Sequence, residues 1–467
     1  MSEANDRMRA KMRAAGVGEP TIDVFVKAVE RVKAGERGLL AESAIEPVTS
    51  VPALEELTEA GADGSQFLRH LAVIKLNGGL GTSMGLDKAK SLLVVKDHET
   101  FLDFTARQIF HLRGGQKRGE PAFYLMNSFV TRDDTLQHLR KYPELGEEGW
   151  LDFVQNKVPK IDAESYEPVT WAREPDLEWC PPGHGDLYPS LLGSGLLERL
   201  LEKGIRYLFV SNSDNLGATV DLKILRYFVQ SGASFLMEVA ARTAADRKGG
   251  HLARDRQNGR LLLRELAQCP KGDEDSFQDV EKYRFFNTNN LWIRVDHLQE
   301  KLDLQGGSLP LPLITNLKTI DPREGDSPKV LQLESAMGAA IECFENSGAV
   351  VVPRSRFSPV KTTSDLLALR SDAYRVTEDW RLVLERSRKG QPPLVELDAN
   401  CYKMLADFEA CFPEGAPSLI ACQSLKVEGP VRFARGVVCQ GNVEFVNPSS
   451  TPKTVAAGIY RDRRISL

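Results

Sequence analysis

Residues Leu71 to Ser91 read LAVIKLNGGLGTSMGLDKAKS, and this stretch decides the fold of the chain. Its first part, Ala72 to Leu76, is a largely apolar run of the length expected for a buried strand. The run ends abruptly, and a loop rich in glycine follows. Because glycine has no Cβ, such a loop can bring its backbone N–H groups against a ligand. Four positions give the loop this property: Gly78, Gly79, Gly81 and Gly85.

Two lysines follow the loop, Lys88 and Lys90, and they favour an anionic ligand such as a nucleoside triphosphate. The spacing of the loop excludes two common phosphate-binding motifs. A dinucleotide fingerprint needs a glycine three residues after Gly81, where Met84 stands. A P-loop needs a glycine, four residues and then Gly-Lys-Ser/Thr, and no glycine of this loop satisfies that. The loop therefore indicates another nucleotide-binding class, with a glycine turn that binds no ligand as the alternative.

The composition is that of an ordinary globular protein. The chain has 467 residues, enough for two or three domains, with 42% hydrophobic and 27% charged residues. Its net charge of -5 predicts neither a nucleic-acid partner nor binding to an anionic membrane. The charged N-terminus is unlike a secretory signal and no apolar run is long enough to span a membrane, so we expect a cytoplasmic protein. Seven cysteines without a C-x-x-C pair argue against a disulfide framework and a zinc site.

Strand-like and helical segments alternate after Leu71, which predicts an α/β fold with a mixed, mainly parallel sheet that binds ligands at the carboxyl ends of its strands. Before it, the stripe from Ile22 to Val32 predicts a helical N-terminal segment. The leucines between Leu192 and Leu201 predict one amphipathic helix, and Val220 to Phe228 predict another. The expected strands are Ala72–Leu76, Leu92–Val95, Ala122–Met126, Tyr207–Val210 and Phe235–Val239.

Two polar segments stand where such a sheet presents its loops. His184 lies in the glycine turn PPGHGD, Pro181 to Asp186, and the residues alone leave it either a ligand contact or a structural histidine. Asp214 lies in SNSDN, Ser211 to Asn215, directly after an expected strand. Its carboxylate suits a hydrated Mg²⁺ that also touches phosphate oxygens, and it equally suits an Asx turn or a helix cap.

Two later segments carry amide and basic side chains. FNTNNLW, Phe286 to Trp292, has amides that can hydrogen-bond sugar hydroxyls, although an asparagine-rich turn explains them as well. PRSRFSPVKTTSD, Pro353 to Asp365, places Lys361 in a proline-stiffened basic loop, which is either a second phosphate clamp or a solvated basic surface.

Apolar residues near the C-terminus recur every six positions, and this period is typical of a parallel β-helix whose strands stack in successive coils. Residues 366–412 are richer in helix formers and connect this domain to the core. The two series with the six-residue period are Leu419, Leu425, Val431, Val437, Val443 and Val427, Phe433, Cys439, Phe445.

Taken together, these segments resemble the eukaryotic-type UDP-glucose pyrophosphorylases, also called UTP:glucose-1-phosphate uridylyltransferases. One such match is weak, but ten in order from about Leu71 to Asp372 are highly specific. The resemblance implies a Rossmann-like nucleotidyltransferase domain over residues 71–365, after an N-terminal segment 1–70, and a left-handed parallel β-helix over residues 413–467. The matching segments are KLNGGLGTSMG, KSLLVVKD, MNSF, FVQNKVP, PPGHGD, SNSDNLGATVD, KGG, FNTNNLW, LESAMGAA and PRSRFSPVKTTSDLL.

The resemblance also implies a role for each matching residue. Lys90 and Lys361 would hold the phosphates from two sides, and Asp214 would bind the nucleotide and Mg²⁺. His184 would contact the sugar phosphate. Nucleotide contacts are implied for Leu76, Asn77, Gly78, Gly79, Met126, Gln155, Gly183 and Asn212, and sugar contacts for Gly250, Asn287, Asn289 and Glu334.

The implied reaction joins UTP and glucose 1-phosphate to give UDP-glucose and pyrophosphate, reversibly and with Mg²⁺. The oligomeric state stays open between a monomer and a homo-oligomer formed through the C-terminal domain. One alternative is a pyrophosphorylase for another or several sugar 1-phosphates, which a comparison of sugar phosphates would reveal. The other is a nucleotide-sugar-binding homologue without turnover, which the presence of Lys90, Asp214 and Lys361 disfavours.

Overall fold

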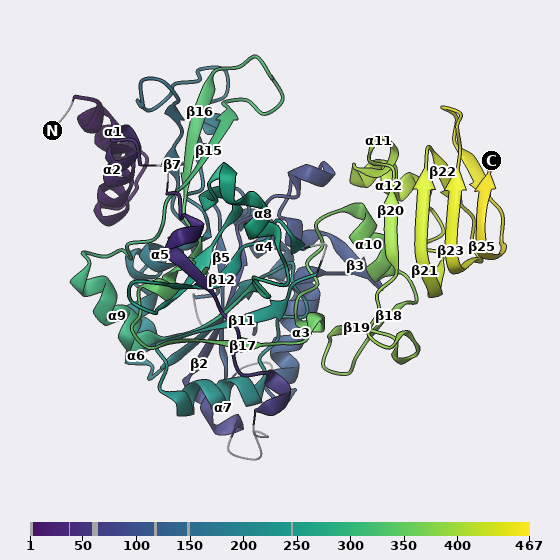
Figure 1. The fold of residues 1–467 in the computed structure, drawn as a ribbon, viewed down its shortest axis with the longest axis horizontal. Helices are drawn as coiled ribbons and strands as arrows, with labels where there is room; N and C mark the ends of the chain where they lie inside the picture. The colour runs from purple at the N-terminus through teal and green to yellow at the C-terminus, as the bar shows by residue number, and fades with distance from the viewer. Residues whose placement is uncertain (1–2, 37, 58–63, 116–118, 147–149, 244–245) are drawn as a thin grey trace.

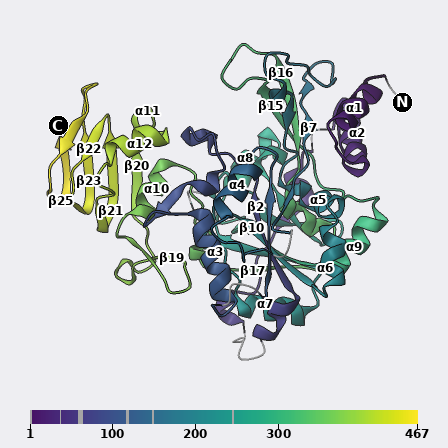
Figure 2. The same cartoon turned by 180° about the vertical axis from the view of Figure 1, so that it is seen from behind.

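The computed structural model describes residues 3–36, 38–57, 64–115, 119–146, 150–243 and 246–467. A central α/β body carries the two N-terminal helices at one end and a region of parallel strands at the other, so that the termini lie far apart (Figures 1 and 2). Nowhere in these described ranges is there a helix with the length and apolar character that crossing a membrane requires.

A large sheet forms the centre of the body. Its strands run in the order β1-β12-β14-β10-β2-β5-β6, with β13 paired to β12, β11 paired to β14, and β17 paired to β11. The bounds are β1 Ile45–Pro47, β2 Leu71–Asn77, β5 Ala122–Asn127, β6 Asp152–Val154, β10 Tyr207–Asn212, β11 Phe235–Ala241, β12 His251–Asp255, β13 Leu261–Arg264, β14 Phe285–Arg294 and β17 Ser347–Val351.

The predicted strands at β2, β5, β10 and β11 and the mixed character of the sheet are confirmed, but the expectation that the sheet is mainly parallel is wrong. Strands β10, β2, β5 and β6 are parallel neighbours, whereas β14 runs antiparallel to both β10 and β11. β12 and β13 form an antiparallel hairpin and β1 is antiparallel to β12. Antiparallel neighbours need no crossover helix, so the alternation of strands and helices fails as a guide in this half of the sheet.

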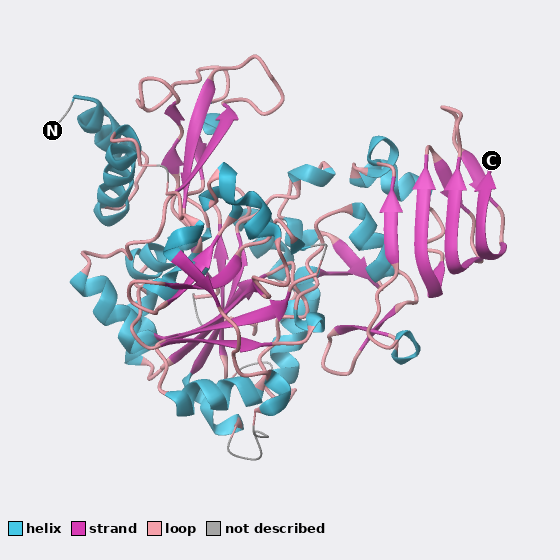
Figure 3. Ribbon diagram, viewed as in Figure 1, coloured by secondary structure: helices cyan, strands magenta, loops and turns pink. Residues whose placement is uncertain are grey.

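Helices cover both faces of the sheet (Figure 3). Ala72 and Ile74 of β2 pack in one core with α5, α6 and α9, while Leu71 and Val73 pack in another with α3, α4 and α7. Because both faces of β2 are buried, its side chains are apolar almost without interruption. The bounds are α3 Phe101–Leu112, α4 Arg132–Leu139, α5 Leu187–Gly193, α6 Leu196–Glu202, α7 Leu222–Ser231, α8 Glu274–Gln278 and α9 Val295–Leu304.

Two predicted elements differ from the structure because of local backbone conformations. The helix expected between Leu192 and Leu201 is divided into α5 and α6, since Gly195 takes a left-handed conformation with φ of 75°. The strand expected at Leu92–Val95 is β3, Val94–Lys96, which pairs with β4, Glu99–Thr100, and does not join the large sheet. Asp97 and His98 both have positive φ and form a tight turn that folds the chain back on itself.

The N-terminal segment is only partly helical. Helix α2, Glu19–Lys33, confirms the predicted stripe, whose residues are buried against a small sheet, and α1, Glu3–Ala14, precedes it. The chain then extends and adds β1 to the large sheet. In Figures 1 and 2 both helices lie beside this small sheet. It contains β15 Ile314–Thr319, β16 Lys329–Glu334 and β8 Ile161–Asp162, next to the pair β7 Val158–Pro159 and β9 Trp179–Cys180.

Parallel strands form the C-terminal region, as the six-residue period predicts. One sheet has the order β20-β21-β23-β25, a second pairs β22 with β24, and the residues of both periodic series are buried. The first sheet already begins at β20, within the segment predicted to connect the domains. The bounds are β18 Tyr374–Val376, β19 Leu382–Leu384, β20 Leu394–Leu397, β21 Ser418–Glu428, β22 Val431–Phe433, β23 Val437–Val446, β24 Lys453–Val455, β25 Gly458–Ser466, α10 Thr363–Arg370, α11 Ala399–Tyr402 and α12 Leu405–Cys411.

The turn between β21 and β22 yields a stability prediction. Gly429 has a φ of 73°, and a Cβ on it would lie 2.0 Å from the carbonyl oxygen of Asn447. We expect Gly429→Ala to lower the free energy of unfolding by about 1–3 kcal/mol, measured by urea denaturation. Gly415→Ala is the matched control, because Gly415 also has a positive φ but no atom within 4 Å of its Cβ position. Equal losses in both variants would contradict a role for the close contact.

Candidate active site

One row of the large sheet brings the predicted nucleotide residues together. In the parallel register, Asn212 of β10 pairs with Leu76 of β2, which pairs with Met126 of β5. These residues stand at the carboxyl ends of the three strands and border a cavity of about 360 Å³. Its lining residues are Leu76, Gly78, Gly79, Leu80, Lys90, Met126, Gln155, Pro181, Gly183, His184, Asn212, Ser213 and Asp214.

The lining includes most of the predicted site residues but not all of them. Leu80, Pro181 and Ser213 were missed as site residues, although each lies within a motif that the sequence displays. Six predicted residues lie outside this lining: Asn77, Gly250, Asn287, Asn289, Glu334 and Lys361.

The glycine loop leaves room for Gln155. A Cβ on Gly78 would lie 2.9 Å from the side-chain nitrogen of Gln155, so a larger residue would displace this amide. The backbone N–H of Lys90 donates to the carbonyl of Gly79 at 3.1 Å, which holds the end of the loop against its beginning. The amide of Gln155 and the ammonium group of Lys90 therefore both lie on the border of the cavity.

Asn77 supports the glycine loop through buried hydrogen bonds. Its Nδ2 donates to Asn127 Oδ1 at 2.7 Å and to Thr135 Oγ1 at 2.9 Å, and its Oδ1 accepts from Ser213 Oγ at 3.0 Å. The side chain is 3% exposed. Its polar groups are used in these contacts, so the side chain links the strand ends of β2 and β5 with the Asp214 loop.

Lys90 and Asp214 form an ion pair on the border of the cavity. Lys90 Nζ lies 2.5 Å from Asp214 Oδ2, and both side chains are 20% exposed. A cation and a carboxylate that remain accessible to a ligand can each accept a new partner, phosphate for the lysine and a divalent cation for the aspartate.

A single carboxylate fits Mg²⁺ that is shared with phosphates. Among the residues that the structure describes, no three His, Cys, Asp or Glu side chains gather as a metal-binding group. Mg²⁺ is commonly bound through one or two carboxylates and the phosphate oxygens of a substrate. Asp214 is thus suited to Mg²⁺ in the presence of a nucleotide.

His184 lines the cavity and carries a neutral ring. Its Nδ1 accepts the backbone N–H of Met337 at 2.9 Å, so the proton of the neutral ring is on Nε2. The ring borders the cavity but is otherwise surrounded by protein, and this burial lowers the pKa of His184 to about 4. The residue is therefore a neutral hydrogen-bond donor at pH 7.

The turn that carries His184 is fixed to the segment after β16. Gly185 N–H donates to Ser335 O at 2.9 Å, and Ser335 N–H donates to Pro182 O at 3.0 Å. Gly183 has a φ of 81°, and a Cβ on it would lie 2.5 Å from the carbonyl oxygen of Ser335. Only glycine allows this close approach at a positive φ.

The amides of β14 form a local structure of their own. The pairing with β11 shifts register at Glu238, and Asn289 has a φ of 60° at this bulge. Asn287 Nδ2 donates to Asn289 Oδ1, and Asn289 N–H donates to Asn287 Oδ1, both at 2.8 Å. Asn287 N–H donates to Gly250 O at 3.2 Å. These contacts join three predicted sugar residues.

The amide cluster borders the segment that holds His184. A Cβ on Gly338 would lie 2.7 Å from Asn287 Nδ2, and Gly338 follows Met337, the partner of His184. The structure therefore connects the predicted sugar residues to the cavity through this short segment.

Comparisons with known proteins identify the family of this chain. The sequence matches the family described as UTP–glucose-1-phosphate uridylyltransferase over residues 22–440. The chain belongs to this family. A probable UTP–glucose-1-phosphate uridylyltransferase of Schizosaccharomyces pombe is 42% identical over 393 residues, which cover 84% of this chain and 76% of the relative.

Two solved structures resemble the whole chain. A variant of UDP-glucose pyrophosphorylase from Leishmania major, in complex with UDP-glucose, has 48% identity and a TM-score of 0.93, with 100% of both chains covered. UDP-glucose phosphorylase from Trypanosoma brucei has 49% identity and a TM-score of 0.92, also with 100% of both chains covered. The likeness to these two structures thus includes the N-terminal helices and the C-terminal strands.

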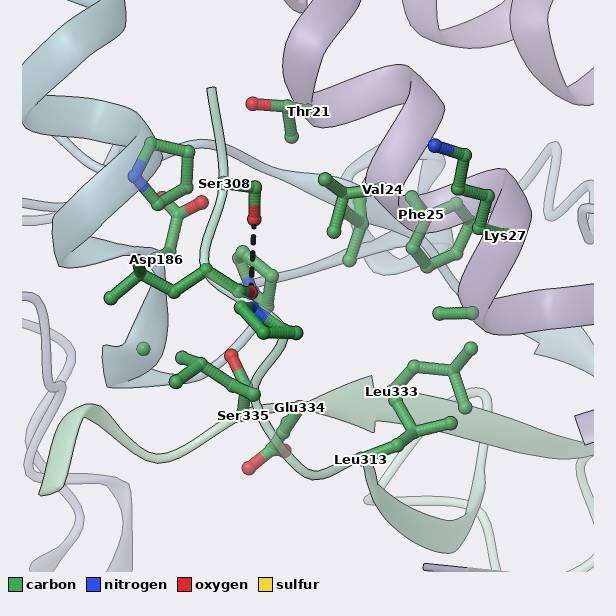
Figure 4. Close-up of a pocket in the computed structure, with 18 of the residues that line it drawn as sticks. Thr21, Val24, Phe25, Lys27, Asp186, Ser308, Leu313, Leu333, Glu334 and Ser335 are labelled. Atoms are coloured by element: carbon green, nitrogen blue, oxygen red, sulfur yellow. Dashed lines mark hydrogen bonds between the residues drawn. The ribbon is translucent and has the colours of Figure 1, made fainter. Parts of the chain in front are cut away.

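Glu334 borders a second cavity. This cavity, of about 280 Å³, lies between α2 and the turn that carries His184. In Figure 4 the Glu334 carboxylate lies on the opposite side of the cavity from Thr21 and Lys27 of α2. Burial raises the pKa of Glu334, against a hydrogen bond with Asn316 that lowers it.

Lys361 lies just before α10 and is exposed. Its backbone N–H donates to Asp365 Oδ2 at 2.8 Å. The preceding residues pack against the Asp214 loop, where Asn215 Nδ2 donates to Arg356 O at 3.0 Å. The structure thus brings the two loops together and leaves the Lys361 side chain at the surface.

The pKa of His184 predicts how stability changes with pH. The folded pKa of about 4 lies below the value of about 6.5 for a free histidine, so the unfolded chain binds the proton first as pH falls. The contribution of the neutral ring is complete above pH 6.5 and is lost between pH 6.5 and 4. Compared with His184→Asn, the native chain should lose roughly 1–3 kcal/mol more over this interval.

Urea denaturation at several pH values between 7 and 4 measures this difference. His111→Asn, which removes an exposed imidazole on α3, is the control and should follow the native chain. Parallel curves for the native chain and His184→Asn would refute the assignment.

Proposed function

We propose that this chain transfers a uridylyl group from UTP to glucose 1-phosphate, giving UDP-glucose and pyrophosphate in a reversible, Mg²⁺-dependent reaction. The observation that carries the proposal is the cavity at the ends of β2, β5 and β10, which combines the glycine loop with Lys90, His184 and Asp214. Membership in the uridylyltransferase family and the likeness to a pyrophosphorylase solved with UDP-glucose support it.

The nucleotide would bind along the row of strand ends. Leu76, Gly78 and Gly79 would face the nucleoside, since small residues let the backbone approach it closely. An amide both donates and accepts hydrogen bonds, so Gln155 suits the polar edge of a uracil. Asn77 would act by holding the loop in place. The remaining nucleotide contacts in this proposal are Met126, Gly183 and Asn212.

Glucose 1-phosphate would lie on the His184 side of the cavity. The Nε2–H group of His184 can donate to a phosphate or sugar oxygen without adding charge. Asn287 and Asn289 would bind sugar hydroxyls next to Gly250, and Glu334 would accept from a hydroxyl at the edge of this region.

The reaction needs no nucleophile from the protein. An anionic phosphate oxygen of glucose 1-phosphate attacks the α-phosphorus of UTP and forms a P–O bond, while the bond to the β-phosphate breaks and its electron pair leaves with pyrophosphate. Two anions must meet, so Lys90 and Lys361 would lower the barrier by attracting the phosphate oxygens from two sides. Mg²⁺, held by Asp214 and phosphate oxygens, would supply further positive charge. The reaction is readily reversed because one phosphoanhydride replaces another.

The charged side chains can be tested directly. We expect Lys361→Ala and Asp214→Ala each to lower kcat at least about a hundredfold, the effect of removing one preorganised electrostatic contact. The assay is pyrophosphate release from UTP and glucose 1-phosphate with Mg²⁺. Lys453→Ala, which removes an exposed cation from β24, should keep full activity. Unchanged activity in either test variant would refute the role given to that residue.

The sugar contacts give a separate prediction. Asn289→Gly preserves the positive φ of this position and removes only the amide. It should raise KM for glucose 1-phosphate about tenfold, the loss of one good hydrogen bond, while KM for UTP stays the same. Comparing glucose, galactose and N-acetylglucosamine 1-phosphates in the same assay tests the alternative of a different or broader sugar specificity. Binding of UDP-glucose without any turnover would instead identify a non-catalytic homologue.

We propose that the coils of residues 413–467 wind as a left-handed β-helix, after a catalytic domain of residues 71–365 and a connecting segment of residues 366–412. The parallel pairing of β21 with β23 and of β22 with β24 supports successive coils. We further propose a cytoplasmic enzyme without nucleic-acid or membrane partners, either monomeric or assembled through this C-terminal domain.

A further inference from the structure

We propose that Asn215, Glu238 and Arg356 are positioning residues that set Lys361 against Asp214 for phosphate transfer. The inference rests on the proposed function, because it assumes that these two charged residues act on the same phosphates. None of the three lines the cavity, and all are buried, with 2%, 0% and 7% of their surface exposed.

Asn215 joins the two loops that carry the charged residues. It follows Asp214 directly, and its Nδ2 donates to Arg356 O at 3.0 Å while its Oδ1 accepts the Ser358 N–H at 3.1 Å. One amide thereby fixes two backbone groups of the chain that leads to Lys361. Because Lys361 itself is exposed, packing does not orient its side chain, and its position depends on these backbone contacts.

The two loops are also in direct contact. A Cβ on Gly217 would lie 2.2 Å from Ser355 O and 3.0 Å from Arg356 Cα. The Asp214 loop is held at both of its ends by Lys75 of β2, whose Nζ donates to Ser211 Oγ at 2.8 Å and to Ala218 O at 2.7 Å. Because these contacts fix both loops at several points, the distance between the Asp214 loop and the Lys361 loop can vary only over a narrow range.

The ion pair between Arg356 and Glu238 anchors the Lys361 loop to the large sheet. Arg356 Nε donates to Glu238 Oε2 at 2.8 Å and Arg356 Nη2 donates to Glu238 Oε1 at 2.7 Å. The second nitrogen also donates to Thr219 O, on the Asp214 loop, at 2.8 Å. A bidentate pair fixes direction as well as distance, which a single contact does not.

Glu238 extends the connection to the predicted sugar residues. Its carboxylate also accepts from Asn290 Nδ2 at 2.9 Å and from Trp292 Nε1 at 3.0 Å, both on β14. Asn290 follows Asn289 and accepts from Asn215 Nδ2 at 3.4 Å. The network therefore links the loops of Asp214 and Lys361 with the strand proposed to bind glucose.

A double-mutant cycle tests whether Asn215 acts through Lys361. We expect Asn215→Ala to lower kcat between about tenfold and a hundredfold, the cost of a small misplacement, with KM for both substrates within threefold of the native value. In a Lys361→Ala background the same change should lower kcat less than twofold, because the group it positions is absent.

Asn447→Ala is the matched control. Asn447 is 3% exposed in the C-terminal region and, like Asn215, binds backbone groups, donating to Pro430 O and Thr451 O and accepting from Ser449 N–H. Its replacement should lower Tm while kcat changes less than twofold. A loss of kcat as large as that of Asn215→Ala would overturn the inference, because any buried asparagine would then have the same effect.

Arg356→Lys provides a second variant if Asn215→Ala does not fold. It keeps the positive charge beside Glu238 but lacks the guanidinium fork, and it should lower kcat to a similar extent with unchanged KM. Equal fold losses from Asn215→Ala with and without Lys361 would overturn the positioning role and leave the proposed function intact. A fully active Lys361→Ala enzyme would instead refute the proposed role of Lys361, and with it this inference.

Discussion

The parallel register of β10, β2 and β5 is the constraint on which the candidate site depends. Backbone hydrogen bonds align Asn212, Leu76 and Met126 in one row, so the loops that follow these strands begin side by side. A slip by one residue would turn every side chain of a strand to the opposite face and would disrupt the packing of both helix-covered cores. The register that preserves the cores therefore also places the glycine loop next to the Asp214 loop.

Opposite charges meet at the edge of this row. Lys90 and Asp214 neutralise each other at 2.5 Å, which keeps a partly buried cation and carboxylate from facing the cavity without a counter-charge. If Lys90 and Asp214 separate, a polyphosphate bound to a divalent cation supplies a new partner for each. The phosphate can pair with Lys90 and the cation with Asp214. His184 adds a donor without charge, so the border combines a cation, an anion and neutral polar groups.

The sequence predicts the parts of the fold that depend on side-chain pattern. The apolar runs of β2, β5, β10 and β11 and the stripe of α2 are recognisable because burial demands them. The division of α5 from α6 at Gly195 and the turn at Asp97 and His98 depend on local φ values, which a hydrophobic pattern does not contain. The antiparallel position of β14 depends on pairing across the sheet, and periodicity within a strand does not indicate direction.

The candidate site likewise contains residues that the sequence indicates and residues that it does not. Gly78, Lys90 and Asp214, which line the cavity, were predicted from their motifs because glycine-rich and charged segments of this kind are unusual for a loop. Asn215 and Glu238 were missed, since an asparagine in a turn and one acidic residue in a strand become informative only when their partners are known.

The pairing of Glu238 with Arg356 has a consequence for divergence within the family. Each charge is buried and has the other as its ionic partner, so the loss of either alone would leave an uncompensated charge in the interior. Substitution at one position should be tolerated only together with substitution at the other. Over evolutionary time the two positions should therefore either both be retained or both change.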